Sequence, residues 1–99
     1  VGTGTKFLKL GMIKELKIIN KLGLHARASS KLVEITNKFE SEIFIEFNSV
    51  SVNAKSVLGL LSLAIPFGSN FHINIKGIDE EEALIEIENL IKNKFGESE

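Results

Sequence analysis

The sequence contains no cysteine, so it can form neither a disulfide nor a zinc site with thiolate ligands. It also lacks a long hydrophobic run, because the longest, 57–67, has 11 residues, includes Ser62 and Pro66, and is too short to span a bilayer. No signal peptide is evident. Only two histidines are present and no carboxylates cluster with them, so we expect neither a metal nor another cofactor. These absences favour a cytoplasmic protein without membrane insertion.

Charge is balanced overall but unevenly distributed along the chain. The 99 residues are 43% hydrophobic and 25% charged, with a net charge of −1, which is typical of one soluble globular domain. Residues 1–49 carry eight Lys and Arg against five Glu, whereas residues 50–99 carry four Lys against eight Asp and Glu. A basic N-terminal half fits an anionic ligand or an acidic partner, although simple solvation accounts for most individual lysines.

The first eleven residues, 1–11, are expected to lie outside the fold. They include three glycines and two threonines, and Met12 follows as a plausible native start. We therefore expect an artificial leader or a disordered arm, with an extra strand over 7–10 as the alternative. The folded domain is expected over 12–96.

From Met12 onward, hydrophobic periodicity predicts alternating strands and helices. Alternation of apolar and polar residues predicts strands near 14–20, 43–47, 50–52 and 71–75. Apolar residues at helical spacing predict helices over 26–38, 57–64 and about 80–94. The order β-α-β-β-α-β-α predicts an α+β fold in which the helices cover one face of a short antiparallel sheet.

Two polar residues are expected to cap helices. Ser56 precedes the helix predicted over 57–64, and Asp79 precedes the last helix, whose acidic first turn at 80–82 complements the helix dipole. His72 lies on the polar side of the last predicted strand, where an exposed residue without a direct role is expected.

The helix predicted over 57–64 is apolar nearly all the way round. A short helix on a sheet can bury only one side, so some of its leucines should reach solvent and mark a docking surface, unless the helix is buried more deeply. An alternative interpretation of Ser56, besides its role as a helix cap, is a regulatory phosphorylation site. A phosphate there would add about −1.5 to −2 charges and repel an acidic partner.

The pentad Gly23-Leu24-His25-Ala26-Arg27 is the most informative motif. It places His25 just before a predicted helix, where backbone N–H groups are unpaired and the helix dipole is positive. The imidazole could accept a phosphoryl group covalently, while the N–H groups and the Arg27 guanidinium hold its oxygens. The competing interpretation is a surface histidine without a role. As a nucleophile His25 must be neutral, and we expect it to be partly exposed with few direct contacts.

The pentad and the segment Asn53-Ala54-Lys55-Ser56-Val57-Leu58-Gly59 together resemble the HPr phosphocarrier proteins of the bacterial phosphoenolpyruvate-dependent phosphotransferase system (PTS). The resemblance covers about 12–96 and implies an open-faced β-sandwich, a four-stranded antiparallel sheet covered by three helices. It implies that His25 takes a phosphoryl group on Nδ1 from enzyme I and passes it to a histidine of an EIIA-type protein in sugar uptake. Arg27 would stabilise the phosphoryl group.

The resemblance also implies regulation and docking. Ser56 matches the serine that HPr kinase/phosphorylase modifies, and the family's partner-docking face includes the positions of Val57, Leu58 and Leu61. It further implies a stoichiometric carrier, rather than a turnover enzyme, that works as a monomer. One departure is Ala28, where the family usually has proline. This departure, with the lead-in over 20–24, resembles the nitrogen-related branch of the family or HPr proteins of Gram-negative bacteria, so a nitrogen-branch carrier (NPr-like) is an alternative.

Two rival functions fit the residues less well. An RNA-binding module is disfavoured because no GxxG loop, aromatic RNA-binding pair or strongly basic face is evident, so no nucleic-acid partner is expected. A purely regulatory protein controlled through Ser56 would have no use for the nucleophile His25.

Overall fold

The computed structural model describes residues 11–99. Its elements are β1 (Met12–Lys17), α2 (Ala26–Thr36), β2 (Glu42–Phe47), β3 (Val50–Asn53), α3 (Val57–Leu63), β4 (Asn70–Lys76), α4 (Glu80–Lys92) and the 3-10 turn η1 (Lys94–Gly96). This order confirms the predicted succession of strands and helices, and η1 is added at the end. The leader expected over 1–11 and the alternative strand over 7–10 lie, apart from Gly11, outside the described residues.

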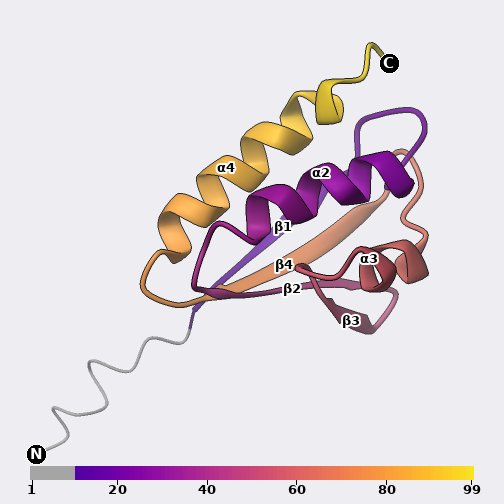
Figure 1. Cartoon of the computed structure of the whole chain (residues 1–99). Coiled ribbons are helices and arrows are strands. Elements are labelled where there is room, and N and C mark those ends of the chain that lie inside the picture. The colour runs from indigo at the N-terminus through magenta and orange to yellow at the C-terminus, as the bar shows by residue number, and fades with distance from the viewer. Residues whose placement is uncertain (1–10) are drawn as a thin grey trace, which may run out of the picture.

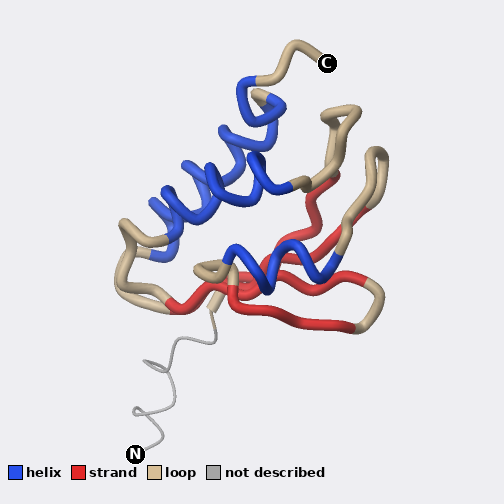
Figure 2. Tube along the Cα trace, turned by 45° about the vertical axis from the view of Figure 1, so that its right-hand side comes forward, coloured by secondary structure: helices blue, strands red, loops and turns tan. Residues whose placement is uncertain are grey.

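The four strands form one antiparallel sheet in the order β1-β4-β2-β3. The helices α2, α3 and α4 cover one face of this sheet, and the other face is open, as Figure 1 and Figure 2 show. The predicted α+β open-faced sandwich is therefore confirmed.

The core lies between the sheet and the helices. Alternate side chains of the central strands β2 and β4 are buried and face the helices, while the polar residues between them are exposed. The buried strand residues are Ile43, Ile45, Phe71, Ile73 and Ile75, and the helices contribute Ala28, Leu32, Leu60, Leu63, Ala83, Leu84, Ile87 and Ile91. Burial of this apolar surface is the main source of stability.

The first strand differs from the prediction. The strand predicted near 14–20 is displaced toward the N-terminus and ends at Lys17. Beyond Lys17, the chain leaves β4 and pairs with the loop that precedes β4. The Ile18 N–H donates to the Ser69 carbonyl (3.0 Å), and the Gly68 N–H donates to the Ile18 carbonyl (2.8 Å). The other strands agree with the predictions to within about one residue.

The helices end slightly before their predicted limits. α2, α3 and α4 end at Thr36, Leu63 and Lys92. Ala64 and Lys94 adopt left-handed backbone conformations, with φ of 50° and 58°, which stop α3 and separate α4 from η1.

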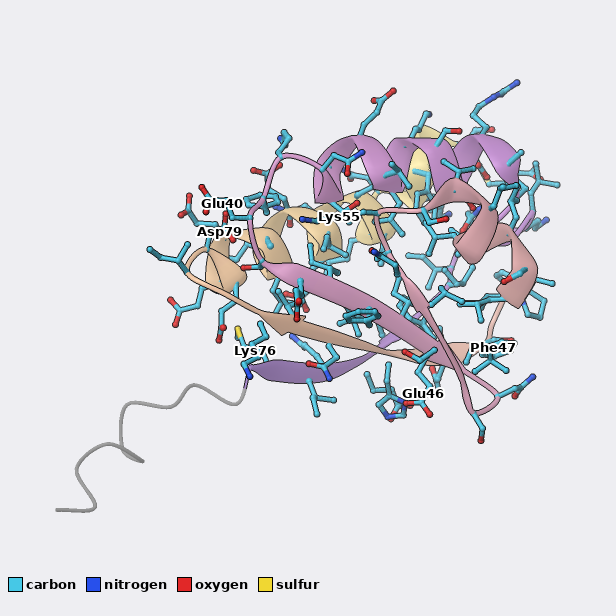
Figure 3. The ribbon with its side chains drawn as sticks, turned by 60° about the horizontal axis from the view of Figure 1, so that its bottom comes forward. Glu40, Glu46, Phe47, Lys55, Lys76 and Asp79 are labelled. Atoms are coloured by element: carbon cyan, nitrogen blue, oxygen red, sulfur yellow. The ribbon has the colours of Figure 1, made fainter. Side chains whose placement is uncertain are left out.

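Asp79 occupies the N-cap position of α4, as predicted, but its side chain makes no capping hydrogen bond. Its carboxylate instead accepts the N–H groups of Glu40 (2.8 Å) and Ser41 (3.0 Å) and the Ser41 hydroxyl. Figure 3 shows Asp79 beside Glu40 at one end of the sheet. These hydrogen bonds, led by that from the Ser41 hydroxyl, lower the pKa of Asp79 below its ordinary value. Asp79 therefore ties the chain before β2 to the start of α4.

The described part of the chain contains no candidate membrane span and no candidate metal site. Between residues 11 and 99, no helix is both long enough and apolar enough to cross a membrane. Within the same range, no three side chains of the types His, Cys, Asp and Glu gather as a metal site would require. His72 is exposed on the open face of the sheet, as expected, and lies 3.8 Å from the Glu15 carboxylate.

Candidate functional site

The loop before α2 brings His25 to the helix N-terminus through a close approach of two backbone segments. Gly23 has a φ of +72°, and a Cβ atom there would lie 2.7 Å from the Ile65 carbonyl oxygen. Only glycine fits this position without a shift of the neighbouring chain. The Leu24 N–H donates to the same carbonyl (2.9 Å), and the Leu24 side chain is buried. The loop is therefore fixed immediately before His25.

His25 is the N-cap residue of α2, as the motif suggested. Its Nδ1 atom accepts a hydrogen bond from the backbone N–H of Arg27 at 3.2 Å, and its carbonyl accepts one from the Ser29 N–H at 2.8 Å. The imidazole thus takes the place that a serine or aspartate oxygen usually has at such a helix end. The side chain is 27% exposed, which confirms that the ring is partly accessible.

The other ring nitrogen has a partner that sequence reasoning missed. His25 Nε2 contacts the Glu97 carboxylate, whose side chain is only 15% exposed. The expectation of few direct contacts is therefore wrong for this side of the ring. The two residues lie at opposite ends of the described chain, and no local motif links them. An acidic residue after the last helix was the only available sign.

The C-terminal segment 94–99 is bent over the start of α2 and held there. Phe95 is fully buried in a left-handed conformation, and its carbonyl accepts a hydrogen bond from Lys31 Nζ at 2.6 Å. The Lys21 N–H donates to the Glu99 carbonyl (2.9 Å). Figure 1 shows the end of the chain beside the loop that joins β1 to α2. The Glu97 carboxylate is thus placed by a fixed backbone.

The Glu97 carboxyl is ionised at neutral pH. Burial alone would raise its pKa, but hydrogen bonds from Asn20 and His25, with the charge of Lys31, outweigh burial and hold the pKa of Glu97 below its ordinary value. The Asn20 Nδ2 group donates to Glu97 at 2.9 Å and to the Gly23 carbonyl at 2.8 Å. The buried Asn20 side chain therefore joins the carboxylate to the loop before His25.

Arg27 lies in the first turn of α2 with its side chain exposed. A dianion attached to Nδ1 would lie against the first-turn N–H groups and the positive end of the helix dipole. The Arg27 N–H that now meets Nδ1 would then be available to a phosphoryl oxygen. The arrangement suits a nucleophilic nitrogen that carries an anionic group.

The second candidate region, α3, has the predicted cap. Ser56 Oγ accepts the Gly59 N–H at 3.0 Å. Leu58 is 79% exposed, Val57 and Leu61 are half-buried, and Leu60 faces the core. The expectation that some of these apolar side chains reach solvent is confirmed. Among the described residues, no hydrogen bond or ion pair joins Ser56 to His25 or Arg27.

Comparison with known proteins agrees with this geometry. A family model described as the PTS HPr component phosphorylation site matches residues 12–93. The phosphocarrier protein HPr of Neisseria meningitidis serogroup A is 44% identical over 89 residues, which are 89% of this chain and 100% of that protein. The crystal structure of HPr-C-His from Thermoanaerobacter tengcongensis superposes with a TM-score of 0.85 at 40% identity, covering 89% of this chain and 99% of that one.

A crystal structure of an HPr dimer from the same organism matches less closely, with a TM-score of 0.68 and 41% identity over 83% of this chain and 94% of that one. These similarities place the chain in the class of protein phosphocarriers. It belongs to the HPr family of the phosphotransferase system.

Proposed function

We propose that this protein carries a phosphoryl group on His25 Nδ1, between phospho-enzyme I and a histidine of an EIIA-type protein. Phosphoenolpyruvate is the original donor, and the route serves sugar uptake. The observation that carries the proposal is the His25 cap, whose Nδ1 lies at the N-terminus of α2 while Nε2 is engaged by Glu97. Of the two ring nitrogens, Nδ1 is thus the one directed at an anion-binding helix end.

The chemistry needs little more than position and charge. The Nδ1 lone pair attacks phosphorus in line, the new N–P bond forms, and the bond to the donor histidine nitrogen breaks with its electron pair. The same exchange in reverse delivers the group to the acceptor. A loose transition state of this kind is stabilised mainly by positioning and by cationic or N–H groups, which Arg27 and the first turn of α2 supply.

Incubation with phosphoenolpyruvate and enzyme I tests the proposal. A label that is labile in acid and stable in base should appear on His25 and be lost in His25→Ala. The matched control is His72→Ala, because His72 is the other histidine and is exposed on the open sheet face. Labelling that persists in His25→Ala, or no label in the wild-type protein, would refute the assignment.

A nitrogen-branch carrier is the second candidate, and Ala28 in place of the family's usual proline is the observation that favours it. Purified EIIA proteins of the sugar and nitrogen branches, offered to the labelled protein in parallel, would separate the two. Faster transfer to the nitrogen-branch acceptor would favour this second candidate.

We further propose that Val57, Leu58 and Leu61 form the docking face and that HPr kinase/phosphorylase modifies Ser56. The exposed Leu58 and the position of Ser56 at the start of α3 support this arrangement. A carrier that visits several partners in turn should act as a cytoplasmic monomer. Light scattering of the purified protein tests this, since a related chain has been crystallised as a dimer.

A further inference from the structure

We propose that Glu97 is a positioning residue for phosphoryl transfer through His25, an inference that rests on the proposed function. Its carboxylate keeps the imidazole proton on Nε2, so that the lone pair is on Nδ1. It also supplies the negative charge that balances the ring when Nδ1 bonds to phosphorus.

The two contacts of the ring select one tautomer. A neutral imidazole has one N–H donor and one acceptor nitrogen. Nδ1 faces the Arg27 N–H, which can only donate, and Nε2 faces the Glu97 carboxylate, which can only accept when ionised. The opposite tautomer would set two donors against each other at Nδ1 and a lone pair against a carboxylate at Nε2. Both contacts therefore place the proton on Nε2 and leave Nδ1 nucleophilic.

The carboxylate is held rigidly enough for this role. Asn20 Nδ2 donates to one Glu97 oxygen and His25 contacts the other, so both oxygens have partners. The buried Phe95 and the Lys31 hydrogen bond to its carbonyl anchor the chain two residues before Glu97. The cation of Lys31 favours the ionised form of Glu97. Burial of Asn20 and Phe95 makes this part of the tail an integral part of the fold.

The carboxylate has a second effect once the phosphoryl group arrives. When the Nδ1 lone pair forms the N–P bond, the bond to the donor nitrogen breaks and no proton moves at His25. Nε2 keeps its proton, so the ring becomes an imidazolium that carries a positive charge. This charge develops directly against Glu97, which stabilises it in a partly water-excluded position. The phosphorylated ring therefore stays in the protonated form, which is the better leaving group for the next transfer.

The tautomer can be measured without any transfer partner. Nitrogen-15 chemical shifts of His25 should show the Nε2–H tautomer in the wild-type protein and a mixture of tautomers in Glu97→Ala. Glu97→Gln keeps an acceptor oxygen and should keep the tautomer. The matched control is Glu99→Gln, because Glu99 lies in the same tail and is exposed, with its carboxylate 3.7 Å from Lys21. This control should match the wild type in every measurement.

The rates of phosphoryl transfer test the role of the negative charge on Glu97. We expect Glu97→Gln, which removes the charge, to slow both the uptake of phosphate from phospho-enzyme I and the hydrolysis of the phosphohistidine by roughly ten- to a hundredfold, the loss that changing a carboxylate behind a metal-bound histidine typically causes. Thermal melting would verify that the variants are folded. Unchanged nitrogen shifts in Glu97→Ala, or unchanged rates in Glu97→Gln, would overturn the inference. Failure of the proposed carrier function can be distinguished from failure of this inference, because the wild-type protein itself would then take no label.

Discussion

The N-termini of α2 and α3 are capped in the same way but differ in what surrounds the cap. At each, a side chain accepts an N–H from its own helix, at 3.2 Å for His25 and 3.0 Å for Ser56. The His25 ring has a second partner behind it, the Glu97 carboxylate from the C-terminal tail. Among the described residues, Ser56 Oγ has no hydrogen-bonded partner beyond its own helix, and Leu58 beside it is exposed.

This difference separates a structural cap from the proposed reactive one. A capping atom already has a lone pair aimed at the helix, and the helix end already favours an anion. A carboxylate on the far side of the imidazole adds control over where the proton lies. The serine hydroxyl needs an external enzyme to become reactive, which agrees with the proposed roles of carrier residue and kinase target.

The largest effect is expected when the His25 cap is made to resemble the Ser56 cap. His25→Ser keeps an oxygen that caps α2, so the free energy of unfolding should stay within about 1 kcal/mol of the wild type or rise slightly. Phosphoryl transfer should be lost completely because the nitrogen nucleophile is gone. Labelling with phosphoenolpyruvate and enzyme I, with urea unfolding alongside, measures both. Residual acid-labile label in a folded His25→Ser protein would contradict the site.

A charge at the second cap should affect docking more than stability. Aspartate caps helices as well as serine, so Ser56→Asp should leave unfolding nearly unchanged. An acidic partner should bind roughly fivefold more weakly, the equivalent of about 1 kcal/mol between two unit charges ~4 Å apart in water. Titration calorimetry with an EIIA protein checks this, and the loss should shrink at high salt.

Ser51→Asp is the matched control for that experiment, because Ser51 is exposed on β3 and lies on the open face of the sheet. It adds the same charge away from α3. Equal weakening by both substitutions would show that net charge, and not the position of Ser56, determines the effect.

Removing the Ser56 cap should affect stability and leave phosphoryl transfer intact. Ser56→Ala loses the hydrogen bond from Oγ to the Gly59 N–H and should lower the free energy of unfolding by about 1 kcal/mol, while His25 still takes its label. Ser62→Ala serves as the control, since its exposed hydroxyl only donates to the Gly59 carbonyl, and its cost should be below about 0.5 kcal/mol. Equal urea midpoints for Ser56→Ala and the wild type would show that the cap contributes nothing.

Most of the fold and half of the His25 site could be predicted from local patterns. The alternation in β2 and β4 predicted the buried residues because each strand has one face against the helices. The His25 cap was predictable because its partner, Arg27, is two residues away. The Glu97 contact was not, because it joins distant segments and depends on left-handed conformations at Lys94 and Phe95 that no residue type there announces.

Asp79 shows why a correct preference can still predict the wrong partner. A carboxylate beside a helix start seeks backbone N–H groups, and the residue type alone suggested those of α4. The fold also brings the N–H groups of Glu40 and Ser41 to the same place, and the carboxylate takes these. The choice depends on how the chain before β2 packs against α4, which is not a local property.

The N-terminus of α4 differs from those of α2 and α3, because the Asp79 side chain there accepts N–H groups of Glu40 and Ser41 instead of those of its own helix. The pKa of Asp79 is lowered in the folded protein by the Ser41 hydroxyl and the Glu40 N–H, so its contribution to stability is present above the ordinary pKa of about 3.9. That contribution is lost as pH falls through the lower folded value. Asp79→Asn should be somewhat less stable near neutral pH and should lose less stability than the wild type on further acidification. Urea unfolding at a series of pH values would show the two curves converging. Parallel curves would mean that the tie to Glu40 and Ser41 does not depend on the charge of Asp79.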